Sequence, residues 1–92
     1  MEIEKLISAL EETIGLLKNS NSSDWASMSI EEIIEELESE IAKAKNSERI
    51  DTKLLGFLFA QTTAIQETSI DNGWGNDFLR ISEVIDELLS ER

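Results

Sequence analysis

The chain has 92 residues, of which 20 are acidic and 8 are basic, and its formal net charge is −12 at pH 7. It contains no histidine, cysteine, tyrosine or proline. The length predicts a single domain over 1–92. The missing residue types exclude disulfides, thiolate metal sites and the Ser-His-Asp and Cys-His catalytic mechanisms. We therefore expect no enzyme activity, no cofactor and no metal site.

The charge and the hydropathy pattern also limit location and partners. Excess carboxylates disfavour direct binding to nucleic acid or to anionic membranes, because both require clustered Lys and Arg. The N-terminal MEIEKLISAL does not resemble a signal peptide, and no apolar run reaches the roughly 20 residues that cross a bilayer. We expect a cytoplasmic protein whose acidity serves either solubility alone or the binding of a basic protein.

The first predicted helix covers residues 2–18. Its apolar residues are spaced by four, three, four and three positions, which places them on one face of an α-helix. These residues are Ile3, Ile7, Leu10, Ile14 and Leu17. The Ser- and Asn-rich segment 19–27 favours a loop, because short polar side chains compete for backbone hydrogen bonds.

The second predicted helix covers residues 30–45 and has the clearest start. Ser29 and Glu32 fit a capping box, and Met28 with Ile33 fit a hydrophobic staple. The apolar stripe consists of Ile30, Ile34, Leu37, Ile41 and Ala44. It has nearly the spacing of the first stripe, so we expect these two helices to pack as a coiled-coil-like pair. We expect no internal sequence repeat.

The third predicted helix covers residues 51–67, with Asp51 as its N-cap. Its first half, LLGFLFA, is apolar on every side, which predicts that this helix is the most buried one. Gln61 falls on the same stripe as Leu54 and Phe57. Either its amide bonds to backbone near the following turn, or this stripe faces a partner and Gln61 and Gln66 contribute to the interface.

The segment DNGWGN, residues 71–76, is a strong turn signal because Asn-Gly favours positive φ. A fourth helix is predicted over 77–91, with Asn76 or Asp77 as its cap. Its stripe consists of Phe78, Ile81, Ile85 and Leu88. Together the four segments predict an all-α fold, a compact antiparallel bundle of four helices.

Six glutamates lie within ten residues of the second helix, and the stripe assignment turns them outward. They are Glu31, Glu32, Glu35, Glu36, Glu38 and Glu40. Like charges three and four positions apart repel by a few tenths of a kcal/mol per pair. The cluster is therefore either a solvated face or a docking surface for a basic protein.

Trp25 and Trp74 both lie in predicted connections. Such residues serve either as plugs at the end of a small core or as interface anchors. Trp74, between two glycines, is the better candidate for exposure. The predicted partner-binding residues are Glu31, Glu32, Glu35, Glu36, Glu38, Gln61, Gln66 and Trp74.

These observations favour a small acidic binding protein that docks a basic protein partner, with an immunity protein or antitoxin as its concrete form. In size and acidity the chain is similar to small four-helix nuclease-immunity proteins. The paired tyrosines followed by proline of those proteins have no counterpart here, so no membership is inferred. Two alternatives stay open: a structural or assembly protein that forms a homodimer, and a DNA mimic that occupies a DNA-binding protein.

Overall fold

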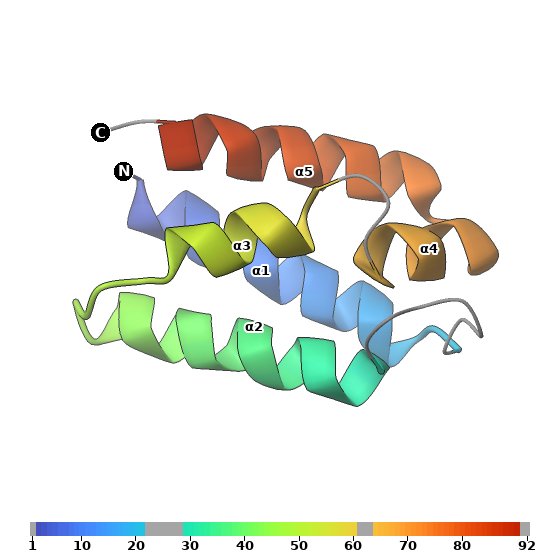
Figure 1. The fold of residues 1–92 in the computed structure, drawn as a ribbon, viewed down its shortest axis with the longest axis horizontal. Coiled ribbons are helices and arrows are strands. Elements are labelled where there is room, and N and C mark those ends of the chain that lie inside the picture. The colour runs from blue at the N-terminus through green and yellow to red at the C-terminus, as the bar shows by residue number, and fades with distance from the viewer. Residues whose placement is uncertain (1, 22–28, 61–63, 91–92) are drawn as a thin grey trace.

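The computed structural model describes residues 2–21, 29–60 and 64–90, and these residues form five α-helices and no strand (Figure 1). The helices are α1 (Ile3–Lys18), α2 (Ile30–Lys45), α3 (Thr52–Leu58), α4 (Ala64–Asp71) and α5 (Gly75–Ser90). The all-helical prediction is confirmed. The predicted number of four helices is not confirmed, because the segment predicted as the third helix contains two separate helices, α3 and the start of α4.

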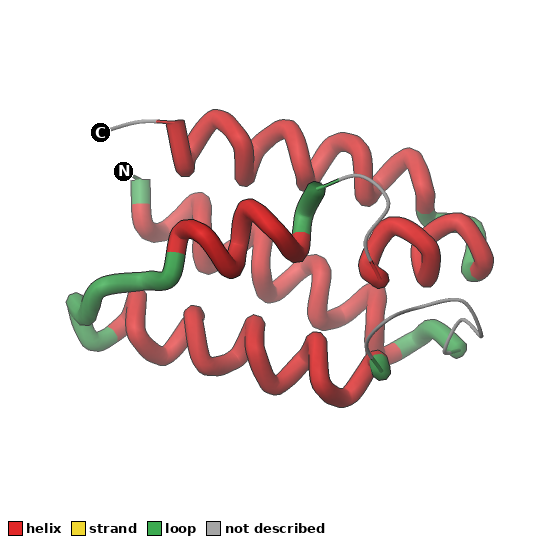
Figure 2. The backbone as a smooth tube through the Cα atoms, in the orientation of Figure 1, coloured by secondary structure: helices red, strands yellow, loops and turns green. Residues whose placement is uncertain are grey.

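Three long helices form the body of the molecule, which measures 35 × 21 × 19 Å. The helix α1 packs against α2 and against α5, and it runs antiparallel to both (Figure 2). The short helix α3 lies in front of α1 in the view of Figure 1 and packs against α5, as does α4. The start of α1 and the end of α5 lie at the same end of the bundle (Figure 1).

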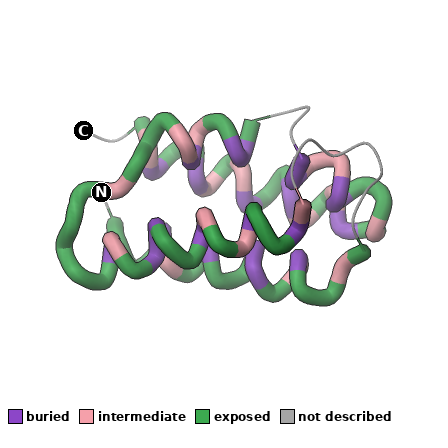
Figure 3. Tube along the Cα trace, turned by 60° about the horizontal axis from the view of Figure 1, so that its bottom comes forward, coloured by how far each residue is buried: buried purple, intermediate pink, exposed green. Residues whose placement is uncertain are grey.

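The core is formed by the inward sides of all five helices (Figure 3). Its fully buried side chains include Leu6, Leu10, Leu17, Ile33, Leu37, Leu55, Ile65, Phe78, Ile81 and Ile85. The predicted stripes are therefore largely the buried faces. Three of their members differ: Ile3 is exposed, and Ile7 and Ile34 are half-buried. On α2 the buried face is rotated toward Ile33, which is fully buried and is not one of the five predicted stripe residues.

The predicted burial of the third helix is not confirmed. Only Leu55 and Leu58 of α3 are buried, and Phe57 on its opposite side is 58% exposed. The helix ends at Leu58, with Phe59 as its C-cap. A helix that covers one side of a bundle leaves its other side in water, whichever residues stand there. The apolar content of α3 therefore did not predict its burial.

The helices α1 and α2 form an internal repeat, contrary to expectation. Pairing each residue with the one 27 positions later aligns IEKLISALEETIGLLKNS with IEEIIEELESEIAKAKNS, and nine of the 18 pairs are identical. Both helices have 16 residues and end at an Asn C-cap of nearly equal geometry, with φ −95° and −94°. Hydrophobic spacing did not reveal the repeat, because any two amphipathic helices share such spacing.

The predicted start signals of α2 and α3 are observed. Glu32 N donates to Ser29 Oγ at 3.2 Å, and Ser29 N donates to Glu32 Oε1 at 3.4 Å, which completes the capping box. Leu54 N donates to the side chain of Asp51 at 3.0 Å. Met28, the other half of the predicted staple, lies outside the described residues. The helix α5 begins at Gly75, so the predicted caps Asn76 and Asp77 lie inside its first turn.

Two helices end in the same left-handed motif. Gly73 has φ +80°, and Gly73 N and Trp74 N donate to Ile70 O and Ser69 O at the end of α4. Ser47 has φ 58° at the end of α2, where Ser47 N and Glu48 N donate to Ala44 O and Lys43 O. These are Schellman caps, which satisfy the last carbonyl groups of a helix and favour glycine at the left-handed position.

Gly15 offers a direct test of helix propensity in α1. A methyl group at this exposed position would meet no other atom within 4 Å. We expect Gly15→Ala to raise the free energy of unfolding by about 0.5–1 kcal/mol, because alanine restricts the unfolded chain and favours helix. Urea denaturation followed by circular dichroism measures this change. Gly73→Ala is the opposing control, since φ +80° disfavours alanine; destabilisation by Gly15→Ala would contradict the prediction.

Candidate functional site

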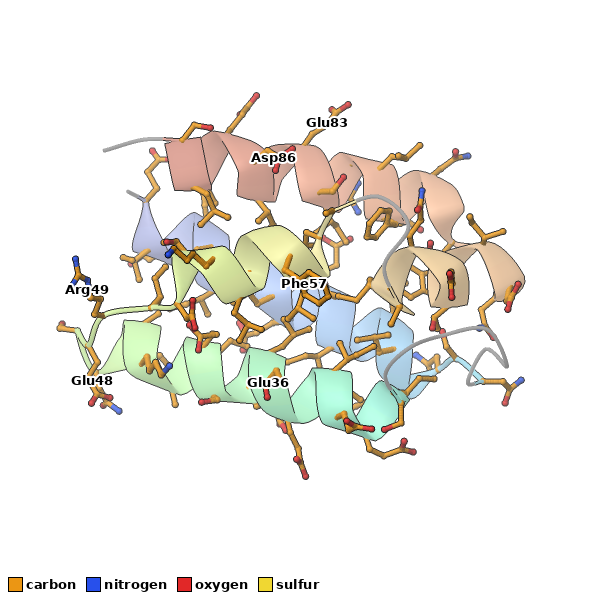
Figure 4. All side chains as sticks on the ribbon, in the orientation of Figure 1. Glu36, Glu48, Arg49, Phe57, Glu83 and Asp86 are labelled. Carbon is orange, nitrogen blue, oxygen red and sulfur yellow. The ribbon has the colours of Figure 1, made fainter. Side chains whose placement is uncertain are left out.

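The acidic residues of α2 divide between two sides of the helix. Glu38 lines a groove between α1 and α2, whereas Glu36 lies on the side that carries α3 (Figure 4). Four of the five predicted partner-binding glutamates are exposed, and Glu36 is half-buried. Within the described parts of the chain none of the five forms an ion pair. The Glu32 carboxylate is nevertheless engaged in the capping box, so its role is partly structural.

Glu40 differs from the rest of the cluster, and its outward assignment was wrong. Its side chain is 1% exposed. Asp51 N donates to Glu40 Oε1 at 2.5 Å, and Lys43 Nζ donates to Glu40 Oε2 at 2.8 Å. The signal was present in the sequence, because Ile33, Leu37, Glu40 and Ala44 follow a four-three-four spacing. Glu40 therefore joins α2 to the start of α3 and does not belong to a docking surface.

The repeat gives Glu40 a counterpart in α1. Thr13 occupies the equivalent position, is also buried, and donates through Oγ1 to Ala9 O at 2.9 Å. At this register position each helix thus carries a buried polar side chain with a hydrogen-bond partner. A polar residue on a core stripe requires such a partner, because an unsatisfied buried group costs about 1–3 kcal/mol.

The ion pair between Glu40 and Lys43 has a defined pH dependence. The hydrogen bond to the Glu40 carboxylate raises the pKa of Lys43 above its usual value, because the carboxylate favours the charged ammonium. While the Glu40 carboxylate is charged, the raised lysine pKa stabilises the fold at pH values below the unfolded-state pKa of lysine. That contribution is lost as the pH rises through the folded-state pKa, in strongly alkaline solution.

Trp74 is 7% exposed and closes one end of the core. Its Nε1 donates to Ser20 Oγ at 2.8 Å. Beside it, Asn21 N donates to Asn72 Oδ1 at 2.9 Å, and Asn72 Nδ2 donates to Asn21 O at 2.8 Å. These bonds tie the end of α1 to the turn before α5. Of the two roles considered for this residue, Trp74 therefore has that of a core plug, and its ring is not available as a surface anchor.

Of the two glutamines that were predicted to contribute to an interface, the structure describes only Gln66. Gln66 is half-buried on α4, where its backbone oxygen accepts a bond from Ser69 Oγ at 2.7 Å. Gln61, like Trp25, lies outside the described residues. The stripe that contains Gln61 is nevertheless informative. Ile50 and Leu54, which precede Phe57 on this stripe, are half-buried against the core, whereas Phe57 is 58% exposed, so the stripe turns outward at Phe57.

The outward side of α3 is the feature that the residue-by-residue prediction missed. We define the α3 face as Ile50, Leu54 and Phe57 with the flanking acids Glu36 and Asp86. In Figure 4, Phe57 points outward from α3, with Glu36 of α2 on one side and Asp86 of α5 on the other. Aromatic residues are enriched in protein interfaces relative to other surface. The stripe was recognised in the sequence, but which side of a uniformly apolar helix faces water was not.

Two surface grooves flank α1. The groove against α5 has a volume of about 320 Å³ and includes Arg80, which bridges Glu12 of α1 and Asp77 of its own helix. The groove against α2 has a volume of about 450 Å³. Among the described residues, no group of three or more acidic side chains lies close enough to hold a metal ion. No described helix is both long and apolar enough to span a bilayer.

Comparison of the chain with protein-family models, curated proteins and solved structures finds no match. Function must therefore be inferred from the surfaces of this chain alone.

Proposed function

We propose that this protein is a non-catalytic binding protein that docks a basic protein partner on the α3 face. The observation that carries this proposal is Phe57, a large aromatic side chain that is 58% exposed and flanked by Glu36 and Asp86. The apolar stripe supplies contact area, and the flanking carboxylates favour a partner with Lys or Arg around an apolar centre. A blocked nuclease or other basic toxin is the concrete form of such a partner.

The apolar and the charged side chains of the α3 face are expected to contribute differently to binding. Full burial of a phenylalanine side chain contributes roughly 1.5–3 kcal/mol. Covering the exposed 58% of Phe57 would therefore contribute about 1–2 kcal/mol. Exposed ion pairs add little affinity, but charge complementarity raises the association rate and selects the partner. The net charge of −12 attracts a basic protein over a longer range.

The residues around the α3 face are not uniformly acidic, and this refines the expected partner. Arg49 and Lys53 are exposed at the start of α3, whereas the carboxylates stand on α2 and α5. A partner surface with basic groups on both sides of an apolar centre would match this arrangement. A uniformly basic surface would meet repulsion at Arg49 and Lys53.

The test compares capture by the wild-type protein and by Phe57→Ala from a lysate of the native host. We expect a protein of basic isoelectric point to be captured by the wild type and by Leu79→Ala, a control in which another exposed apolar side chain is truncated. With that protein purified, Phe57→Ala should raise Kd about 5- to 20-fold. An unchanged Kd, or capture of no basic protein by the wild type, would contradict the proposal.

A second measurement tests the flanking charges. Glu36→Gln combined with Asp86→Asn should slow association at low ionic strength more than Glu4→Gln combined with Asp71→Asn. Both variants change the net charge from −12 to −10, since each removes two carboxylates. Equal slowing would show that only net charge matters and would argue against the α3 face. Displacement of the partner by duplex DNA would identify its covered surface as a nucleic-acid site.

A further inference from the structure

The Asn-Gly pair of the sequence, Asn72-Gly73, lies in the turn between α4 and α5. Asparagine followed by glycine is chemically labile, because glycine has no side chain to hinder attack by its backbone nitrogen on the asparagine amide. We propose that Asn72 is a protected deamidation site. It stays intact while the end of the bundle beside Trp74 is closed, and it is modified irreversibly when that end opens.

The reaction uses only the chain itself and water. The backbone nitrogen of Gly73 bonds to Cγ of Asn72 and closes a five-membered imide ring. The side-chain nitrogen of Asn72 leaves as ammonia and takes with it the proton of the Gly73 N–H. Water then breaks one of the two bonds between the ring nitrogen and a carbonyl carbon. Cleavage at Cγ gives aspartate, and cleavage at the main-chain carbonyl carbon gives isoaspartate.

Hydrogen bonds hold both reacting groups in the folded protein. Asn72 Oδ1 accepts from Asn21 N at 2.9 Å, and Asn72 Nδ2 donates to Asn21 O at 2.8 Å and to Thr68 O at 2.9 Å. The side chain thus makes three of the four hydrogen bonds that an amide can make. Gly73 N donates to Ile70 O at 3.3 Å. Ring closure requires the side chain to turn toward this nitrogen, so these bonds must break first.

Two of the three side-chain bonds depend on the position of α1. They come from the backbone of Asn21, which is 51 residues from Asn72, and the neighbouring Ser20 Oγ accepts from Trp74 Nε1. All of these bonds break together when the end of α1 separates from the turn. Local opening of a folded protein has its own free energy, at or below that of global unfolding. The rate of deamidation should therefore follow the fraction of molecules in which this end is open.

The products cannot restore the closed arrangement. Aspartate has a carboxylate oxygen in place of Nδ2, so a negative charge would face the carbonyl oxygens of Asn21 and Thr68. Isoaspartate also adds one methylene group to the main chain, directly before the Schellman cap at Gly73. Deamidation therefore fixes a transient opening as a permanent change. None of these residues belongs to the α3 face, so the proposal is independent of the proposed function.

Peptide mapping by mass spectrometry measures the deamidation rate at Asn72. We expect the folded protein to react at least about 10-fold more slowly than a free peptide of residues 69–76 in the same buffer. Ser20→Ala removes the acceptor of the Trp74 indole and should raise the folded rate about 3- to 10-fold. Ser82→Ala is the matched control, because Ser82 is also half-buried and its hydroxyl also donates to a backbone carbonyl of its own helix. It should change the rate by less than about twofold.

Asn72→Asp reproduces one product and tests its effect on the fold. We expect it to lower Tm by at least about 4 °C, because two hydrogen bonds are lost. Asn76→Asp is the control with the same net charge of −13 (−12 minus one), placed in the first turn of α5, where the helix dipole favours an anion. It should not lower Tm.

Three results would each overturn the proposal. The first is a folded protein that deamidates as fast as the free peptide or faster, which would show that the hydrogen bonds of Asn72 do not protect it. The second is an equal rate in Ser20→Ala and Ser82→Ala. The third is an equal Tm for Asn72→Asp and Asn76→Asp. If Asn72→Asp does not fold at all, the expected loss of stability is met, and the comparison with the free peptide, which uses the wild-type protein, still decides.

Discussion

Replacing Glu40 with alanine is expected to lower the free energy of unfolding by about 2–4 kcal/mol. The substitution removes a buried side chain and leaves the Asp51 N–H without its carboxylate acceptor. It also separates α2 from the N-terminal end of α3, the helix that carries Phe57. Urea denaturation followed by circular dichroism measures the stability. Hydrogen exchange across residues 51–58 should show that the loss is greatest at α3.

The matched variant Glu40→Gln separates the two bonds of this carboxylate. A glutamine can still accept the bond from Asp51 N, but it cannot form an ion pair with Lys43. We expect Glu40→Gln to be less destabilising than Glu40→Ala, because the backbone donor of Asp51 keeps a partner. If Glu40→Ala changes the stability by less than about 0.5 kcal/mol, Glu40 behaves as a surface residue and the structural role assigned to it is wrong.

Replacing Trp74 with alanine is expected to cost about 3–5 kcal/mol, the range for removing a large buried aromatic side chain. The ring closes one end of the core, and its Nε1–H is bonded to Ser20 Oγ at 2.8 Å. A domain of this size is typically stable by about 5–15 kcal/mol, so the variant should unfold at a much lower temperature. Differential scanning calorimetry measures the change.

Two companion variants identify the source of the loss. Trp74→Phe keeps a buried aromatic ring but removes the donor to Ser20 together with part of the ring volume, so we expect a smaller cost of about 1–2 kcal/mol. Leu79→Ala truncates an apolar side chain that is 46% exposed and should change the stability by less than about 0.5 kcal/mol. Equal effects of Trp74→Ala and Leu79→Ala would contradict the assignment of Trp74 as a core plug.

The parts of the fold that local chemistry determines were predictable. The bounds of α2 follow from the capping box at Ser29 and the lysines of its last turn, and the observed helix begins and ends where these signals stand. The turn before α5 follows from Asn-Gly, and Gly73 has the positive φ that this pair favours. Such signals act within a few residues, so no knowledge of the packing is needed.

The errors arose where distant residues decide the outcome. The side of α3 that faces water depends on how the helix lies against α5, and its apolar sequence gave no preference. The spacing on α2 indicated that Glu40 is buried, but its hydrogen-bond donor is a backbone group 11 residues away. The indole of Trp74 likewise bonds to a serine 54 residues away. The candidate site has the same dependence, because Glu36, Phe57 and Asp86 lie on one side of the molecule only through the packing of three helices.

The side-chain hydrogen bonds at the two ends of the bundle differ in the number of residues between their two partners, which is the length of the chain loop that each bond closes. Glu40 and Asp51 are 11 residues apart, whereas Asn21 and Asn72 are 51 residues apart. By polymer theory the longer loop costs about 1.4 kcal/mol more in chain entropy. Ordering the Glu40 end during folding therefore has the lower entropic barrier. The Trp74 end can close only after most of the chain has been brought together.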